Sequence, residues 1–155
     1  MTSTFYSRVC KNPRVLSSRA RFASRALVEL SRHFGEGPVR IEDVAERQNI
    51  PLKYLQQILL ELKADGFLDS RKGPGGGYTL ARRPEEITLA EVVRAMDGPI
   101  AAVSCVSVFS YQECGCPDPE TCSLRRTFGE LRQAMLAVLD RTTFADLAAE
   151  AGVPD

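Results

Sequence analysis

The glycine-rich run Lys72–Gly77 narrows the possible folds of this chain more than any other stretch. A strand pattern, Phe67–Arg71, precedes the run, and a second one, Tyr78–Ala81, follows it. A phosphate-binding nucleotide loop would instead open a helix with a lysine followed by serine or threonine. Glycines in the run permit positive φ angles and let the backbone approach a partner closely. The run therefore predicts a β-hairpin rather than a nucleotide-binding loop.

Helical patterns precede the hairpin. Ser17–Phe34 has an apolar face, Ser17 or Ser18 as its N-cap and a stop at Gly35, and Ile41–Gln48 forms a second, short helix. After a break at Asn49, a third helix is expected from Pro51 as its first residue. Its core-facing stripe consists of Leu52, Leu55, Ile58, Leu59 and Leu62. Two helices joined by a short turn have the spacing of a helix-turn-helix, whose second helix presents its N-terminal residues to the major groove.

The outward residues of the helix that begins at Pro51, and those of the hairpin, have side chains suited to contacting DNA. The helix presents one cation and three polar side chains that can contact phosphates or base edges: Lys53, Tyr54, Gln56 and Gln57. An ordinary polar outer face is the alternative, since amphipathic helices always have one. At the hairpin tip, Arg71 and Lys72 suit a narrow minor groove, and Gly75 and Gly76 allow a close backbone approach.

The distribution of charge divides the chain. Residues 1–84 contain 15 Lys and Arg against 8 Asp and Glu, whereas residues 85–155 contain 5 against 12. Such a split suggests a nucleic-acid-facing part and a different second part. No signal-peptide pattern and no apolar run long enough for a membrane span are found, so we expect a cytoplasmic protein. An enzyme is not expected, because the chain has one histidine and no nucleophile–base constellation.

The acidic half begins with a helix and continues, beyond a cysteine-rich stretch, with a long amphipathic one. Thr88 and Glu91 form a capping-box pattern for a helix that ends at Gly98. Later apolar residues recur at spacings of four, three, four and three, namely Leu124, Phe128, Leu131, Met135 and Val138. This heptad-like seam needs a partner helix. A second copy of the chain fits the two-fold symmetry of DNA half-sites; packing on the chain's own DNA-binding half is the alternative.

Four of the five cysteines lie within 18 residues that have no helical or strand period, as Cys105, Cys114, Cys116 and Cys122. In a reducing compartment, clustered cysteines are more often metal-binding or redox-active than structural disulfides. Soft thiolates bind iron–sulfur clusters and zinc. Metal-free thiol sensing, structural zinc and a purely structural loop remain as alternatives to a cluster. Cys10 is expected to be an idle thiol, and His33 an ordinary boundary residue.

The order of these motifs carries a family resemblance. The matching segments are Arg21-Phe22-Ala23, Arg25-Ala26-Leu27, Val44-Ala45-Glu46-Arg47-Gln48, Lys53-Tyr54-Leu55, Arg71-Lys72-Gly73-Pro74-Gly75-Gly76-Gly77-Tyr78 and Glu86-Ile87-Thr88-Leu89. They resemble the Rrf2 family of bacterial winged-helix transcription regulators, which includes iron–sulfur and nitric-oxide sensors. The resemblance implies a mainly α fold with a small β-hairpin wing. It also implies an N-terminal extension (1–13), a winged helix-turn-helix DNA-binding domain (14–84), and a sensor region with a long dimerisation helix (85–155).

The resemblance also assigns roles to residues. It implies an operator duplex and a homodimeric partner, and an iron–sulfur cluster held by Cys105, Cys116 and Cys122. Where relatives place a histidine or a partner carboxylate as fourth ligand, this chain has Arg125 and Arg21. Cys114 is then the expected fourth ligand; the alternatives are Glu113, Asp118 and Glu120. A metal-free regulator that responds to thiol oxidation, or to a partner protein, is the alternative function.

Overall fold

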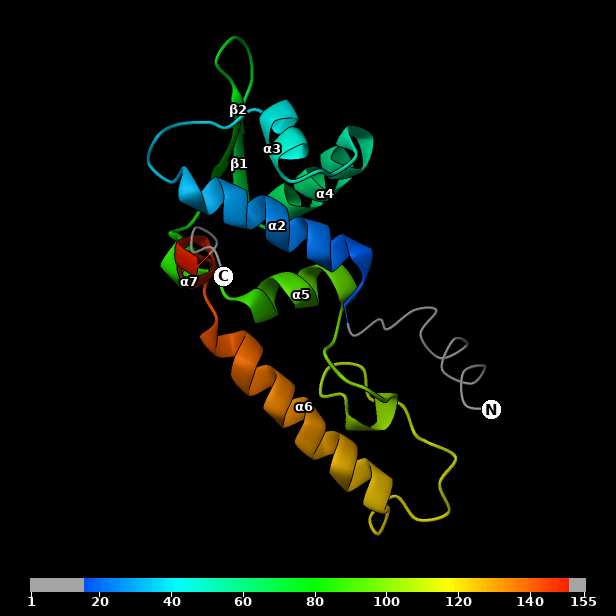
Figure 1. The fold of residues 1–155 in the computed structure, drawn as a ribbon. Helices are drawn as coiled ribbons and strands as arrows, with labels where there is room; N and C mark the ends of the chain where they lie inside the picture. The colour runs from blue at the N-terminus through cyan, green and yellow to red at the C-terminus, as the bar shows by residue number, and fades with distance from the viewer. Residues whose placement is uncertain (1–15, 151–155) are drawn as a thin grey trace, which may run out of the picture.

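The computed structural model describes residues 16–150, so the predicted N-terminal extension with Cys10 lies outside the described residues. The described chain has six α-helices and one two-stranded antiparallel sheet, which confirms the predicted mainly α fold with a hairpin wing (Figure 1). In chain order the elements are α2 (Ser18–Arg32), α3 (Ile41–Arg47), α4 (Leu52–Ala64), β1 (Leu68–Arg71), β2 (Gly77–Leu80), the short 3₁₀ helix η1 (Pro84–Glu86), α5 (Leu89–Asp97), the 3₁₀ helix η2 (Ser104–Val106), α6 (Ser123–Arg141) and α7 (Phe144–Glu150).

Local capping explains where several helices begin. The Ser17 hydroxyl accepts a hydrogen bond from the Ala20 amide at 3.0 Å and caps α2, as the sequence predicts. At α5, Thr88 and Glu91 form the predicted reciprocal capping box. Pro51, expected as the first residue of α4, is instead its N-cap, because its backbone is extended (ψ 124°) rather than helical.

The wing is a tight hairpin with a third segment beside it. β1 pairs antiparallel with β2, with Arg71 opposite Gly77. Val39, in the segment before α3, exchanges two 2.9 Å backbone hydrogen bonds with Tyr78 on the other edge of β2. A Cβ atom on Gly76 would lie 2.3 Å from the Arg71 carbonyl oxygen, so this turn accepts only glycine without moving.

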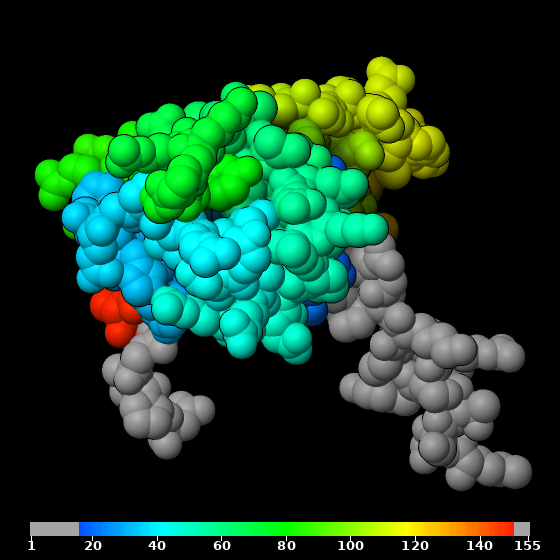
Figure 2. Space-filling model, turned by 90° about the horizontal axis from the view of Figure 1, so that it is seen from above, coloured from blue at the N-terminus to red at the C-terminus, as the bar shows by residue number. Residues whose placement is uncertain are grey.

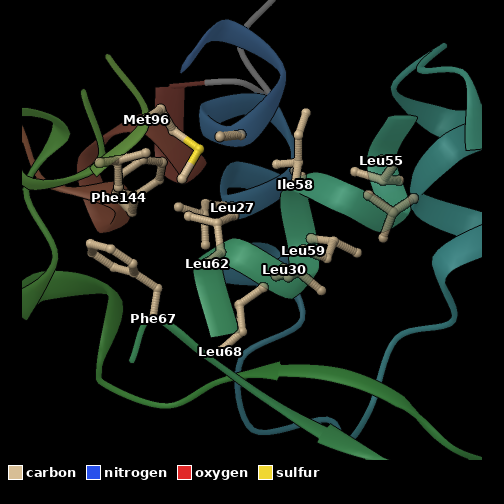
Figure 3. Close-up of a cluster of buried hydrophobic side chains, with 14 of the residues drawn as sticks. Leu27, Leu30, Leu55, Ile58, Leu59, Leu62, Phe67, Leu68, Met96 and Phe144 are labelled. Atoms are coloured by element: carbon tan, nitrogen blue, oxygen red, sulfur yellow. The ribbon is translucent and has the colours of Figure 1, made fainter. Parts of the chain in front are cut away.

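One apolar core joins the wing, the helix-turn-helix and the C-terminal helix. Figure 3 shows Leu27 of α2, Leu59 and Leu62 of α4, and Phe144 of α7 converging, with Phe144 fully buried. Most of the predicted α4 stripe belongs to this core. Leu52 was assigned to it wrongly: this first residue of α4 is 38% exposed, and the buried stripe begins at Leu55.

The long helix α6 extends away from the rest of the chain. It packs against α5 at one end and runs down to the cysteine-rich loop at the other (Figure 1). None of its residues is buried within the single chain. Over the described residues, no helix is long and apolar enough to cross a membrane.

Candidate nucleic-acid interface and thiol site

Seen from above, α3, α4 and the wing lie together on one face of the molecule (Figure 2). On α4, Lys53, Gln56 and Gln57 are exposed. On the wing, Arg71 and Lys72 are exposed where β1 ends. Gly75 is exposed and Gly76 half-buried in the turn between the strands. The fold thus brings the two predicted groups of DNA-contacting residues onto one side of the molecule.

Tyr54 differs from the other predicted contact residues because it is half-buried. Its ring meets the Phe22 ring of α2 edge to face, with the ring centroids 5.8 Å apart. The guanidinium groups of Arg21 and Arg25 each lie 5.9 Å from the centroid of the Phe22 ring. The start of α4 is therefore packed onto α2, and two arginines of α2 flank that contact.

The four predicted thiols lie along the loop that joins α5 to α6. Cys105 lies in η2, Cys114 and Cys116 follow in irregular chain, and Cys122 is the N-cap residue of α6. All four are free and half-buried. A hollow of about 590 Å³ is bordered by Cys105 and Cys122 together with the start of α6. The sensor loop and the proposed dimer helix are thus joined at Cys122.

The thiols are neighbours along the loop. The Sγ atoms of Cys116 and Cys122 are 3.9 Å apart, and Cys105 and Cys116 both influence the pKa of Cys114. Hydrogen bonds from the Cys116 thiol and backbone lower the pKa of Cys114. Cys114 and Cys122, which both hydrogen-bond with the Cys116 thiol, raise the pKa of Cys116 to about 12. The neighbouring Cys116 thus favours the thiolate form of Cys114.

The acidic residues considered as fourth ligands have other contacts. Asp118 accepts hydrogen bonds from the Glu120 amide at 3.0 Å and the Thr121 hydroxyl at 2.7 Å, which lower its pKa. Glu120 forms an ion pair with Arg125 at 3.2 Å. Arg125 also donates to the Pro119 carbonyl at 3.3 Å and approaches the Tyr111 ring. The role of Arg125 in ordering the loop was not predicted, because no sequence pattern links it to Tyr111 or Pro119.

The donor set fits an iron–sulfur cluster by its chemistry, since four soft, free thiols lie on one loop. In the described part of the chain, however, no three side chains of His, Cys, Asp or Glu are arranged ready to hold a single metal ion. His33, the one histidine, lies at the end of α2, where its Nδ1 contacts Glu36 at 2.6 Å. It is a boundary residue, as predicted, and is not part of the thiol site.

The residues of the predicted dimer seam lie along α6. Leu124, Leu131 and Val138 are 65%, 46% and 49% exposed, and Phe128 and Met135 are half-buried. In a single chain, this apolar row therefore remains largely in contact with water.

Known proteins share this arrangement. Residues 16–150 match the Rrf2 family, described as iron-dependent transcriptional regulators. Protein rrf2 of Nitratidesulfovibrio vulgaris is 36% identical over 138 residues, covering 89% of each chain. The HTH-type transcriptional regulator IscR of Aliivibrio salmonicida is 33% identical over 132 residues, covering 85% of this chain and 76% of IscR. The solved structure of CymR, the global cysteine regulator of B. subtilis, has a TM-score of 0.74 and 30% identity, covering 87% of this chain and 96% of CymR.

A match of this extent, together with the hairpin wing and the helix-turn-helix described above, settles the family. The relatives are named as HTH-type regulators of transcription, which is consistent with DNA as the partner class and confirms the resemblance found in the sequence. The chain belongs to the Rrf2 family of winged-helix transcription regulators and is not an enzyme.

Proposed function

We propose that this regulator binds its operator as a cytoplasmic homodimer under the control of an iron–sulfur cluster held by Cys105, Cys114, Cys116 and Cys122. The observation that carries the proposal is the gathering of four half-buried, free thiols on one loop, where the Sγ atoms of Cys116 and Cys122 are 3.9 Å apart. A bound cluster would supply a centre whose oxidation or loss changes the loop. The family description, which names iron, supports the same ligand class.

Cys114 is the proposed fourth ligand. Its pKa is influenced by Cys116 and Cys105, whereas Asp118 and Glu120 are already engaged in hydrogen bonds and an ion pair. Its lowered pKa also favours a metal ligand, because thiols bind metals as thiolates. Glu113 is exposed, and no contact of its carboxylate with the thiols supports it as a ligand.

The DNA interface follows from the shared face of α4 and the wing. Lys53, Gln56 and Gln57 would enter the major groove with the start of α4, while Arg71 and Lys72 would reach the minor groove. Tyr54 would take part mainly by fixing α4 against Phe22, since its ring is already packed there. Gly75 and Gly76 would let the wing backbone lie close to phosphates.

The fold offers a route from the thiols to this interface. Cys122 caps α6, and Arg94 of α5 forms an ion pair with Asp140 of α6 at 3.2 Å. Both α5 and α7 pack against α2, which in turn packs against α3 and α4. A change at the start of α6 would therefore act on helices that support the helix-turn-helix, and a dimer would convert it into a change of half-site spacing.

Purification without oxygen tests the cluster directly. The wild-type protein should be coloured and contain iron and acid-labile sulfide, measured by absorption spectroscopy and chemical assay. Cys114→Ser should lose most of the iron, because a ligand of the cluster is removed. Cys10→Ser, which removes the one cysteine outside the loop, should keep it. A colourless, iron-free wild-type protein would show that the cluster proposal is wrong.

A metal-free thiol switch is the second candidate, and the 3.9 Å separation of the Cys116 and Cys122 sulfur atoms favours it. Peroxide would oxidise two thiols to a disulfide and be reduced to water, a change that mass spectrometry of the unreduced protein detects. A triple variant with Cys105→Ser, Cys116→Ser and Cys122→Ser distinguishes a response to a partner protein from a response that needs the thiols. Unaltered control of transcription in cells by that triple variant would support a protein partner.

A further inference from the structure

A buried carboxylate lies in the last turn of α2, next to apolar residues of the core. Glu29 is 3% exposed and occupies the helical turn between Ala26 and Leu30, both of them buried. An apolar side chain could pack at this position without the cost of burying a charge, which is high unless the charge is paired. The partners of Glu29 therefore indicate why a charge is present.

Both oxygen atoms of Glu29 accept hydrogen bonds from the end of α3. Oε1 accepts from Arg47 Nη1 at 2.9 Å, and Oε2 accepts from Gln48 Nε2 at 3.0 Å. Arg32 of α2 adds a contact to Oε2 at 3.3 Å. His33 Nε2 lies 3.5 Å from Oε1 and 2.7 Å from Arg47 Nη1. The carboxylate is thus fully occupied and linked across two helices.

Arg47 and Gln48 stand at the turn of the helix-turn-helix. Arg47 is the last residue of α3 and Gln48 its C-cap, and Asn49 follows with a positive φ of 48° before α4 begins. One helical turn before Glu29, Arg25 donates hydrogen bonds to the backbone carbonyl and the side-chain oxygen of Gln48. Helix α2 therefore holds this turn at two points, through Arg25 and Glu29.

We propose that Glu29 is a positioning residue for DNA recognition: it fixes the α3–α4 turn through Arg47 and Gln48, so that the start of α4 is held at the angle that fits the operator. The proposal rests on the DNA binding of the family and not on the cluster. A shift of the turn would move Lys53 and Gln56 relative to base edges, on which specificity depends, while cations of the surface would still attract any duplex.

The ionisation state of the Glu29 carboxylate agrees with this positioning role. Burial would raise the pKa of Glu29, but the hydrogen bonds from Arg47 and Gln48 and the charges of Arg47 and Arg32 outweigh burial and lower it. Glu29 is therefore ionised at neutral pH and accepts at both oxygen atoms.

Glu29→Gln is the sharpest single change. The two side chains have the same shape, but a Gln amide presents N–H groups where one oxygen stood, so a donor would face Arg47 or Gln48. DNA selected from a random duplex library by the wild-type protein serves as the operator, and an unrelated duplex as the non-specific probe. Affinity for the operator should fall by about tenfold, the loss expected when a hydrogen bond to a charged group fails. Affinity for the unrelated duplex should not fall.

A second substitution should reverse the loss. In Glu29→Gln with Gln48→Glu, the Gln amide can donate to the new carboxylate and still accept from Arg47, and the net charge equals that of the wild type. Arg25, whose Nε lies 3.4 Å from the Gln48 side-chain oxygen, would pair with that carboxylate. Operator affinity should return most of the way to the wild-type value.

Glu42→Gln is the matched control, because it removes the same charge from an exposed position on α3. It should leave the ratio of operator to non-specific affinity unchanged. The proposal is overturned if Glu29→Gln retains the wild-type ratio, if both affinities fall in proportion as they would for a folding defect, or if the double variant recovers nothing. A wild-type protein that selects no DNA at all would instead contradict DNA binding itself.

Discussion

The Glu91 carboxylate illustrates how a single residue ties stability to pH. Burial would raise its pKa, but hydrogen bonds from the Thr88 amide and from Arg82 outweigh burial and hold the pKa below the ordinary 4.5. Because the pKa is lower in the folded than in the unfolded chain, the ionised group stabilises the fold above the unfolded value. That stability is lost as the pH falls below 4.5 through the folded pKa.

We therefore predict that Glu91→Gln flattens the fall of the melting temperature on acidification. Thermal unfolding followed by circular dichroism from neutral pH to about pH 3 measures this slope. The control is Glu85→Gln, which removes an exposed carboxylate paired with Arg83 at 3.5 Å and should keep the wild-type slope. Equal slopes for wild type and Glu91→Gln would contradict the prediction.

Single residues also mark the limit of what the sequence predicts. The Thr88–Glu91 capping box was predicted, and Ser17 was one of the two serines predicted as the cap of α2, because the partners of both caps lie three residues away along the chain. Glu29 was not, because its partners Arg47 and Gln48 lie 18 and 19 residues further on. The sequence does carry one signal for Glu29, an acidic residue among the apolar residues of the Ser17–Phe34 helix. An argument from periodicity alone treats such a residue as an exception.

At the scale of elements, periodicity located the helices and the wing but not what covers them. It identified the core face of α4 from Leu55 onward, yet it included Leu52, which is 38% exposed. A period shows which side of a helix is apolar; the neighbouring elements decide how much of that side is buried. The tight wing was foreseeable from its glycines, because close backbone contact is a local property.

Helix α7 anchors the end of the chain to the DNA-binding core. Phe144 is fully buried, and its amide donates to the Ile87 carbonyl at 3.0 Å. Phe144→Ala should lower the free energy of unfolding by about 3–5 kcal/mol, because it removes a large buried side chain and leaves a cavity. Denaturant titration measures the change.

The same substitution at an exposed position provides the control for Phe144. Phe109 is 73% exposed, so Phe109→Ala should change the free energy of unfolding by no more than about 0.5 kcal/mol. Similar effects of the two substitutions would mean that α7 is not part of the stable core.

At the scale of the whole molecule, the sequence predicted the sensor loop by composition but not by arrangement. Irregular chain has no period from which contacts can be derived, so the approach of Cys116 to Cys122 emerged only in three dimensions. The domain division at residue 84 stays a prediction. Helices from both sides of it, α2 and α7, pack in one core.

The extended position of α6 has a consequence for assembly. None of its residues is buried in the single chain, and Leu124, Leu131 and Val138 are largely exposed. Burial of each such side chain against a partner contributes about 1.5–3 kcal/mol, so a second copy of the helix would stabilise the pair considerably. A homodimer also places two copies of α4 at the two half-sites of a palindromic operator.

We predict that Leu131→Glu converts the protein to a monomer, because a charged side chain in the seam would be buried without a partner. Sedimentation equilibrium should give the mass of two chains for wild type and of one chain for the variant. Gln133→Glu, an equal change of charge two residues along α6 at an exposed position outside the seam, should remain a dimer. Circular dichroism should show that both variants keep their helices. If Leu131→Glu remains a dimer with intact helices, the two copies must associate through a surface other than this seam.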